Sequence, residues 1–200
     1  MYIGSNLRCK QENCGSNKKV RFLHKIDSTI LEKKMIRDKI DKILDCLPEE
    51  ELENVFWSIV FIQEDYIYKQ NLREKGVVIE SVNEAEEIID LWDKTFAQNI
   101  SEKLKEEIYY EQFKWHIFSY EKQKCLEKEV ARKAFDTLFK EVFYVMYQGS
   151  PIIFLYTNAN EVISRDFDTQ QDIYIFDKNF TWTYVHTHES MCGPYFYKIN

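Results

Sequence analysis

The chain has 200 residues, of which 44% are hydrophobic and 30% charged, a composition typical of a globular protein with a packed core rather than of a disordered one. Its formal charge of −7 repels phosphate backbones, which argues against nucleic acid as the main partner. The most apolar stretch, Val55–Ile62, is far shorter than the roughly 20 residues that span a bilayer, and the first 20 residues lack the apolar core of a secretory signal.

Cysteine usage indicates the compartment. The five cysteines are odd in number and scattered along the chain, which fits reduced thiols better than a disulfide framework. We therefore expect a cytoplasmic protein. The five are Cys9, Cys14, Cys46, Cys125 and Cys192.

Residues 1–27 are polar and basic, and we interpret them as a flexible tail. Residues 1–25 carry six basic side chains and one acidic side chain, so that the rest of the chain has a net charge of −12. Such a tail could contact RNA, fold back on the acidic body or remain solvated. Cys9, Cys14 and His24 lack a fourth ligand, so a zinc site is not predicted there.

Residues 28–75 are predicted to form a helical hairpin. Thr29 and Glu32 have the spacing of a capping box, and apolar residues follow at helical spacing. Pro48 and the three glutamates after it favour the start of a second helix, which ends near Gly76. The Val55–Ile62 stretch is apolar around almost the whole helix, so it must dock on the following domain or form a homodimer.

The part of the chain over residues 76–200 begins with a short β-like segment, Val77–Ile79. Capping patterns at Ser81 and Asn99 predict two helices, the second with a dense aromatic run up to Tyr120. A further helix is predicted from Leu126 onwards.

The apolar period changes to two after residue 141, which indicates strands. Helices followed by strands predict an α+β fold, with an antiparallel sheet of four to five strands and helices packed on one sheet face. The predicted strands are Val142–Tyr147, Ile152–Tyr156, Asp172–Phe176, Thr181–Glu189 and Tyr195–Lys198.

Three stretches, Phe113–Glu121, Asp172–Glu189 and Gly193–Phe196, occur in this order and resemble the bacterial domain-of-unknown-function family 4275. The resemblance covers about residues 77–200. It implies a small bacterial cytosolic domain and no established activity.

The last predicted strands place four unusual side chains in one row, because alternate residues of a strand share a face. The row consists of Trp182, Tyr184, His186 and His188. It could form a recognition surface, since Tyr and Trp are enriched at binding hot spots.

The same row could instead form a metal site. His186 and His188 could both reach one zinc ion, with His116 or Cys192 as a third ligand. Glu189 would point to the opposite face. The plainer alternative is that His188 makes a structural hydrogen bond and His186 is exposed.

Nucleophilic catalysis was the third possibility. Cys192 or Ser190 beside His188 and Glu189 supplies the residue types of a nucleophile, a base and an orienting acid. Adjacent residues of a strand cannot generally align in this way, and no glycine-rich elbow supplies oxyanion donors. His116 lies within the aromatic run and is interpreted as a core residue with one hydrogen-bond partner.

The function favoured by the sequence is therefore non-enzymatic protein binding, for which a basic, toxin-like partner of an immunity or antitoxin protein is one version. The alternative is a metal-dependent hydrolase centred on His186 and His188, with zinc as its cofactor. Nucleotide binding is not indicated, because no phosphate-binding glycine motif is present.

Overall fold

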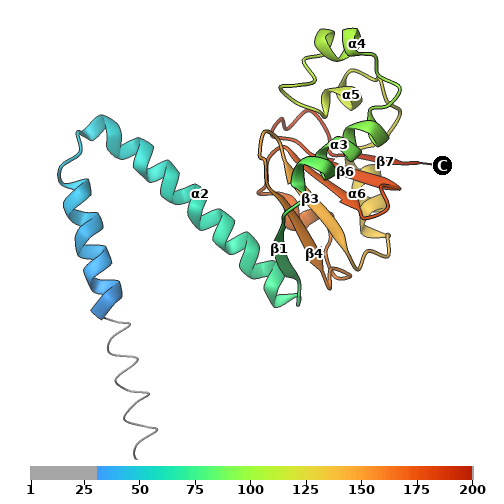
Figure 1. Cartoon of the computed structure of the whole chain (residues 1–200). Coiled ribbons are helices and arrows are strands. Elements are labelled where there is room, and N and C mark those ends of the chain that lie inside the picture. The colour runs from blue at the N-terminus through green and yellow to red at the C-terminus, as the bar shows by residue number, and fades with distance from the viewer. Residues whose placement is uncertain (1–30, 200) are drawn as a thin grey trace, which may run out of the picture. The chain divides into compact units, whose positions relative to one another are not determined.

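The computed structural model describes residues 31–199 (Figure 1). These residues divide into two compact units, with the boundary between Ile59 and Val60. The predicted basic tail and the Thr29 cap lie outside the described residues. Within residues 31–199, no helix has the length and apolar character needed to cross a membrane.

Two helices come first in the described part of the chain. Residues 31–44 are helical, and α2 spans Glu49–Glu74. The predicted start after Pro48 and the predicted end near Gly76 are confirmed. Gly76 has a φ of +83°, which is the left-handed conformation that glycine adopts most readily after a helix.

The remaining elements alternate between short helices and strands. They are β1 (Val78–Val82), α3 (Ala85–Phe96), α4 (Glu102–Glu107), α5 (His116–Ser119), β2 (Leu126–Glu127), α6 (Lys128–Asp136), β3 (Phe143–Tyr147), β4 (Ile153–Thr157), the 3-10 helix η1 (Ser164–Phe167), β5 (Ile173–Asp177), β6 (Trp182–His186) and β7 (Tyr195–Lys198).

All seven strands form one antiparallel sheet with the order β1-β4-β3-β5-β6-β7-β2 (Figure 1). The α+β class is confirmed, and the five predicted strands appear as β3 to β7. The sheet has more strands than predicted: β1 at one edge overlaps the β-like segment Val77–Ile79, and the two-residue β2 at the other edge was not predicted. Leu126, predicted to begin a helix, lies in β2, and the helix begins at Lys128.

Helices cover both faces of the sheet, not one face as predicted. On β5, Ile173 and Ile175 belong to a core cluster that includes residues of α2 and α6. Tyr174 and Phe176, between them, belong to a second cluster with α3 and α5. The four residues from Ile173 to Phe176 are all apolar and buried, so β5 is covered on both sides.

The predicted aromatic helix is interrupted. It appears as α4 and α5, separated by a turn in which Tyr109 has a φ of +54°. The cap of α4 is Ser101, whose Oγ accepts a hydrogen bond from the Leu104 N–H at 3.3 Å. Ser81 lies in β1 and does not cap α3. Tertiary packing of the aromatic side chains outweighs helix propensity here.

Candidate functional site

The Asp172 side chain is hydrogen-bonded to His188 and Trp115 near the C-terminal loop. Its two carboxylate oxygens lie 2.8 and 2.7 Å from His188 Nδ1, and Oδ1 also accepts a hydrogen bond from the His188 backbone N–H at 3.2 Å. The Trp115 indole Nε1–H donates to the same Oδ1 at 2.9 Å. A carboxylate accepts hydrogen bonds, so these contacts favour the His188 tautomer with the proton on Nδ1.

The β-hairpin of β5 and β6 explains why Asp172 meets His188. Ile173 pairs with His186, so in the same register Asp172 lies opposite Thr187 and next to His188. Asp172 has a φ of +49°, a left-handed conformation that aspartate tolerates better than most residues.

A buried hydrogen-bond network holds Trp115 in place. The Trp115 backbone N–H donates to the Tyr174 hydroxyl at 3.1 Å, and this hydroxyl donates to Gln148 Oε1 at 2.6 Å. Burial raises the pKa of Tyr174 well above its usual value, so its hydroxyl keeps its proton. The indole that orients Asp172 is therefore fixed by the core.

The His188 ring lies against aromatic side chains. Its centroid is 5.0 Å from the Phe113 ring and 5.9 Å from the Trp115 ring. The side chain is 34% exposed and that of Asp172 is 16% exposed. Nε2 lies 3.9 Å from Glu189 Oε1. The ring is therefore held by Asp172 on its Nδ1 side, and its Nε2 side faces Glu189.

His186 and His188 have different neighbours. The predicted row of Trp182, Tyr184, His186 and His188 therefore does not continue beyond His186. Burial and the nearby Arg132 guanidinium lower its pKa. Arg132 Nη1 is 2.6 Å from Asp168 Oδ1. Because β6 ends at His186, the alternation that sets the face of a strand residue no longer applies to His188.

Trp182 and Tyr184 belong to the core cluster that includes α6, and they are only 5% and 0% exposed. They therefore cannot supply the recognition surface predicted from this row. The physical reason is that helices cover both faces of β6. The Tyr184 hydroxyl is buried without a hydrogen-bond partner, and burial raises the pKa of this tyrosine.

The structure does not bring the metal candidates together. The His116 Nδ1 is hydrogen-bonded to the Ile108 carbonyl, so its one partner is a backbone group. Within residues 31–199, no group of three His, Cys, Asp or Glu side chains could hold a metal ion. The candidates His186, His188, His116 and Cys192 are therefore separate residues and not a ligand set.

The Cys192 thiol is not activated as a nucleophile. Its pKa is raised, chiefly by a hydrogen bond to Glu189 and also by burial, so that the thiol rather than the thiolate is favoured. Ser190 is exposed. The Thr187 hydroxyl donates to the Cys192 carbonyl, which closes the loop after β6.

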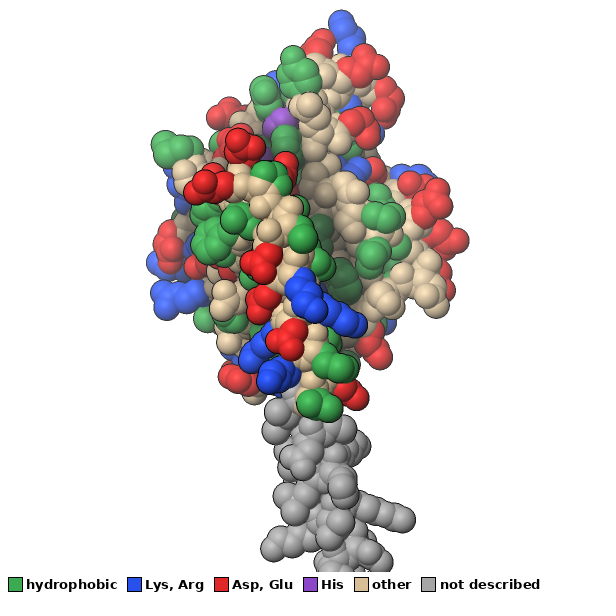
Figure 2. All heavy atoms as spheres, turned by 90° about the vertical axis from the view of Figure 1, so that its left-hand side faces the viewer, with side chains coloured by type: hydrophobic (Ala, Val, Ile, Leu, Met, Phe, Trp, Pro, Cys, Tyr) green, Lys and Arg blue, Asp and Glu red, His purple; other side chains and the backbone are tan. Residues whose placement is uncertain are grey.

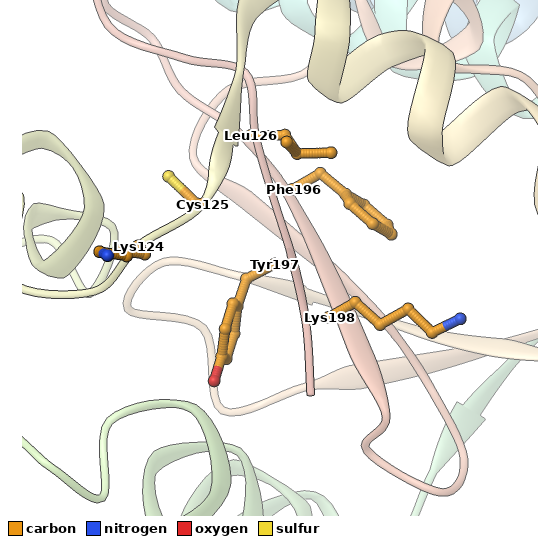
Figure 3. A pocket seen from close by; sticks show the side chains of 6 residues that line it. All are labelled: Lys124, Cys125, Leu126, Phe196, Tyr197 and Lys198. Carbon is orange, nitrogen blue, oxygen red and sulfur yellow. The ribbon is translucent and has the colours of Figure 1, made fainter. Parts of the chain in front are cut away.

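A shallow pocket lies where β2 meets β7 and has a volume of about 300 Å³. Figure 3 shows Cys125 and Tyr197 on one side of these two strands, with Leu126 and Phe196 on the other. Lys124 and Lys198 complete the lining. Burial raises the pKa of Cys125 to about 12, so this thiol is protonated at neutral pH and the pocket has no reactive sulfur.

The first two helices carry an unusual amount of exposed apolar surface. We call residues 31–67 the apolar helical segment. Hydrophobic side chains reach the surface between acidic and basic ones (Figure 2). Large hydrophobic residues that are at least 37% exposed in this segment are Leu31, Met35, Ile36, Ile40, Ile43, Leu52, Phe56, Trp57, Ile59, Phe61, Ile62, Tyr66 and Ile67. Clusters of this size mark interaction sites in monomeric proteins.

Comparison with known families identifies the α+β part. The model of the family described as Domain of unknown function (DUF4275) matches residues 65–196, which is more than half of the chain. The chain belongs to this family. The match begins before residue 77, and the structure shows why: Tyr68 and Leu72 of α2 are part of the domain core. No curated protein and no solved structure matches the chain.

Sequence reasoning missed Asp172 and Trp115 as partners of His188. A usable signal was present for Asp172, because the predicted strands Asp172–Phe176 and Thr181–Glu189 are separated by only four residues, and a short hairpin connection limits the register that places Asp172 opposite Thr187. No such signal existed for Trp115, which approaches from a segment 57 residues away in the sequence.

Proposed function

We propose that this chain works by binding another protein, without catalysing a reaction, and that the apolar helical segment forms the binding surface. The observation that supports this proposal most directly is burial. In α2, which has 26 residues, only Tyr68 and Leu72 are buried. Leaving so many large apolar side chains in water is costly, and a protein partner would remove them from it.

The proposal places this activity in the bacterial cytoplasm. Reduced thiols fit that compartment, and Cys46, Cys125 and Cys192 are free.

Two neighbouring residues of α2 allow a matched test. Ile62 is 69% exposed and Phe61 is 60% exposed, so glutamate at either position adds the same charge at similar solvent access. Immobilised full-length wild-type, Ile62→Glu and Phe61→Glu proteins would be incubated with a lysate of the cells that carry the natural gene. Bound proteins, including further copies of this chain, would be quantified by mass spectrometry.

We expect Ile62→Glu to reduce capture of the partner by at least about 10-fold, because a charge is then buried without a counter-ion. Phe61→Glu should retain the partner, because Phe61 lies on the side of α2 that carries Tyr68 and Leu72, outside the apolar stripe that includes Ile62. Equal capture by all three proteins would show that the apolar helical segment is not the binding surface.

A further inference from the structure

We infer that the partner of the apolar helical segment is a second copy of this chain, and that the two copies form an antiparallel bundle of four helices. This inference rests on the proposed function and specifies its partner. Three properties of the segment support a second copy: the spacing of its apolar residues, the side of α2 on which they lie, and the distribution of charge.

Both helices contain a row of apolar residues at coiled-coil spacing, and α2 also carries apolar residues beside this row, at Phe56, Trp57 and Phe61. In α2, alternate steps of three and four residues connect the residues of one apolar stripe. They are Leu52, Val55, Ile59, Ile62 and Tyr66. Steps of four and three connect Ile36, Ile40 and Ile43 in the first helix. Such a stripe is buried when it meets another stripe of the same kind, and a second copy always supplies one.

The α+β domain uses the other side of α2. A helix turns 100° per residue, so Tyr68 and Leu72 lie on the side opposite to Ile59 and Tyr66. Tyr68 and Leu72 are 3% and 0% exposed in the domain core. Ile62 and Tyr66 are therefore left in solvent by the same packing that anchors the C-terminal turns of α2.

The first helix is slightly basic, whereas the turn and the first part of α2 are strongly acidic. Residues 31–44 carry five basic and three acidic side chains, whereas residues 45–65 carry seven acidic and no basic ones. In a bundle of two hairpins, each basic helix can lie between two acidic helices, one from each copy. Charges beside the apolar seam select the partner and the orientation of coiled-coil helices.

The exposed area also matches the requirement of a dimer. Seven of the exposed residues lie on the two stripes, and at roughly 80 Å² each they offer roughly 560 Å² of apolar surface per copy. A stable interface takes ~800 Å² from each partner, of which about 57% is apolar, so this surface is large enough for a dimer. The seven are Ile36, Ile40, Ile43, Leu52, Ile59, Ile62 and Tyr66.

The test is sedimentation equilibrium of the full-length protein at low and high concentration, for wild type, Ile62→Glu and Phe61→Glu. We expect a wild-type dimer, a dissociation constant at least about 100-fold higher for Ile62→Glu, and little change for Phe61→Glu. Circular dichroism would confirm that the variants keep the α+β fold.

A wild-type protein that stays monomeric at the highest concentration would overturn the inference. A dimer that Ile62→Glu leaves intact would also overturn it, because its interface would then lie elsewhere. Failure of this inference is distinguishable from failure of the proposed function: a monomer that captures a different protein through Ile62 refutes only the second copy. A monomer that captures nothing refutes both.

Discussion

At the scale of single residues, the Asp172 carboxylate accepts hydrogen bonds from three donors. It accepts hydrogen bonds from the Trp115 indole and from the backbone and ring of His188. It does so from a left-handed backbone conformation, which costs a residue other than glycine about 1 kcal/mol or more. The surrounding network must outweigh this cost, so we expect Asp172 to contribute strongly to stability.

Replacing Asp172 by alanine should lower the free energy of unfolding by about 3 kcal/mol, because the buried Trp115 N–H then lacks an acceptor and alanine is strained at this φ. Asp172→Asn, which tolerates the backbone and keeps one acceptor oxygen, should lose less. Denaturant titration measures both. The control is Asp168→Ala, which breaks the partly exposed pair with Arg132 and should cost under about 1 kcal/mol. Equal losses at both positions would contradict this role.

The lowered pKa of His186 predicts that the stability of the protein depends on pH. Its pKa is lower in the folded protein than in the unfolded chain, because of burial and Arg132 and despite the nearby Gln170 backbone, Asp168 and Asp172. The unfolded chain therefore binds a proton more readily. The free energy of unfolding is therefore unaffected by His186 above pH 6.5, the pKa of an unperturbed histidine. It decreases as the pH falls below 6.5, because the unfolded chain then gains a proton that the folded protein binds less readily.

Urea titrations of wild type and His186→Gln between about pH 7 and 5 would test this dependence. The unfolding free energy of the variant should fall less steeply with decreasing pH, by at most about 1.4 kcal/mol per pH unit, the effect of one proton. If the unfolding free energies of the two proteins changed equally with pH, the pKa of His186 would be the same in the folded and the unfolded chain.

At the scale of elements, the end of α2 decides where the domain begins. The Val77 N–H donates to the Leu72 carbonyl at 3.0 Å and the Gly76 N–H to the Arg73 carbonyl at 2.9 Å. These two bonds form a Schellman motif, which requires a left-handed residue at position 76. Leu72 and Val77 on either side are both buried, so the motif directs the chain from α2 into β1 within the core.

Gly76→Ala should therefore destabilise the protein by about 1–2 kcal/mol. No atom lies within 4 Å of the position that the added Cβ would occupy, so the loss comes from backbone strain and not from a clash. Gly76→Asn should recover part of it, because asparagine adopts the left-handed conformation more readily. Thermal or chemical unfolding measures the difference, and an alanine variant as stable as wild type would disprove the strain.

At the scale of the whole molecule, a sheet buried on both faces accounts for the aromatic content. Phe, Tyr and Trp make up 16% of the chain, and many of these residues fill the two core clusters. Tyrosine density was therefore a weak signal for recognition. The stronger signal is the exposed apolar surface of residues 31–67, whose period could be read from the sequence although its occupant could not.

The sequence by itself determined the α+β class, the five strands from β3 to β7 and the bounds of α2, because these follow from local periodicity and from Pro48 and Gly76. The tertiary structure alone decided that helices cover both sheet faces and that Trp182 and Tyr184 are buried. It also decided that His186 and His188 have different neighbours. A strand with apolar residues on both faces does not show which helix covers which face, and the alternation of side chains no longer holds where a strand ends. Asp172 and Trp115 meet His188 only because the chain folds back on itself.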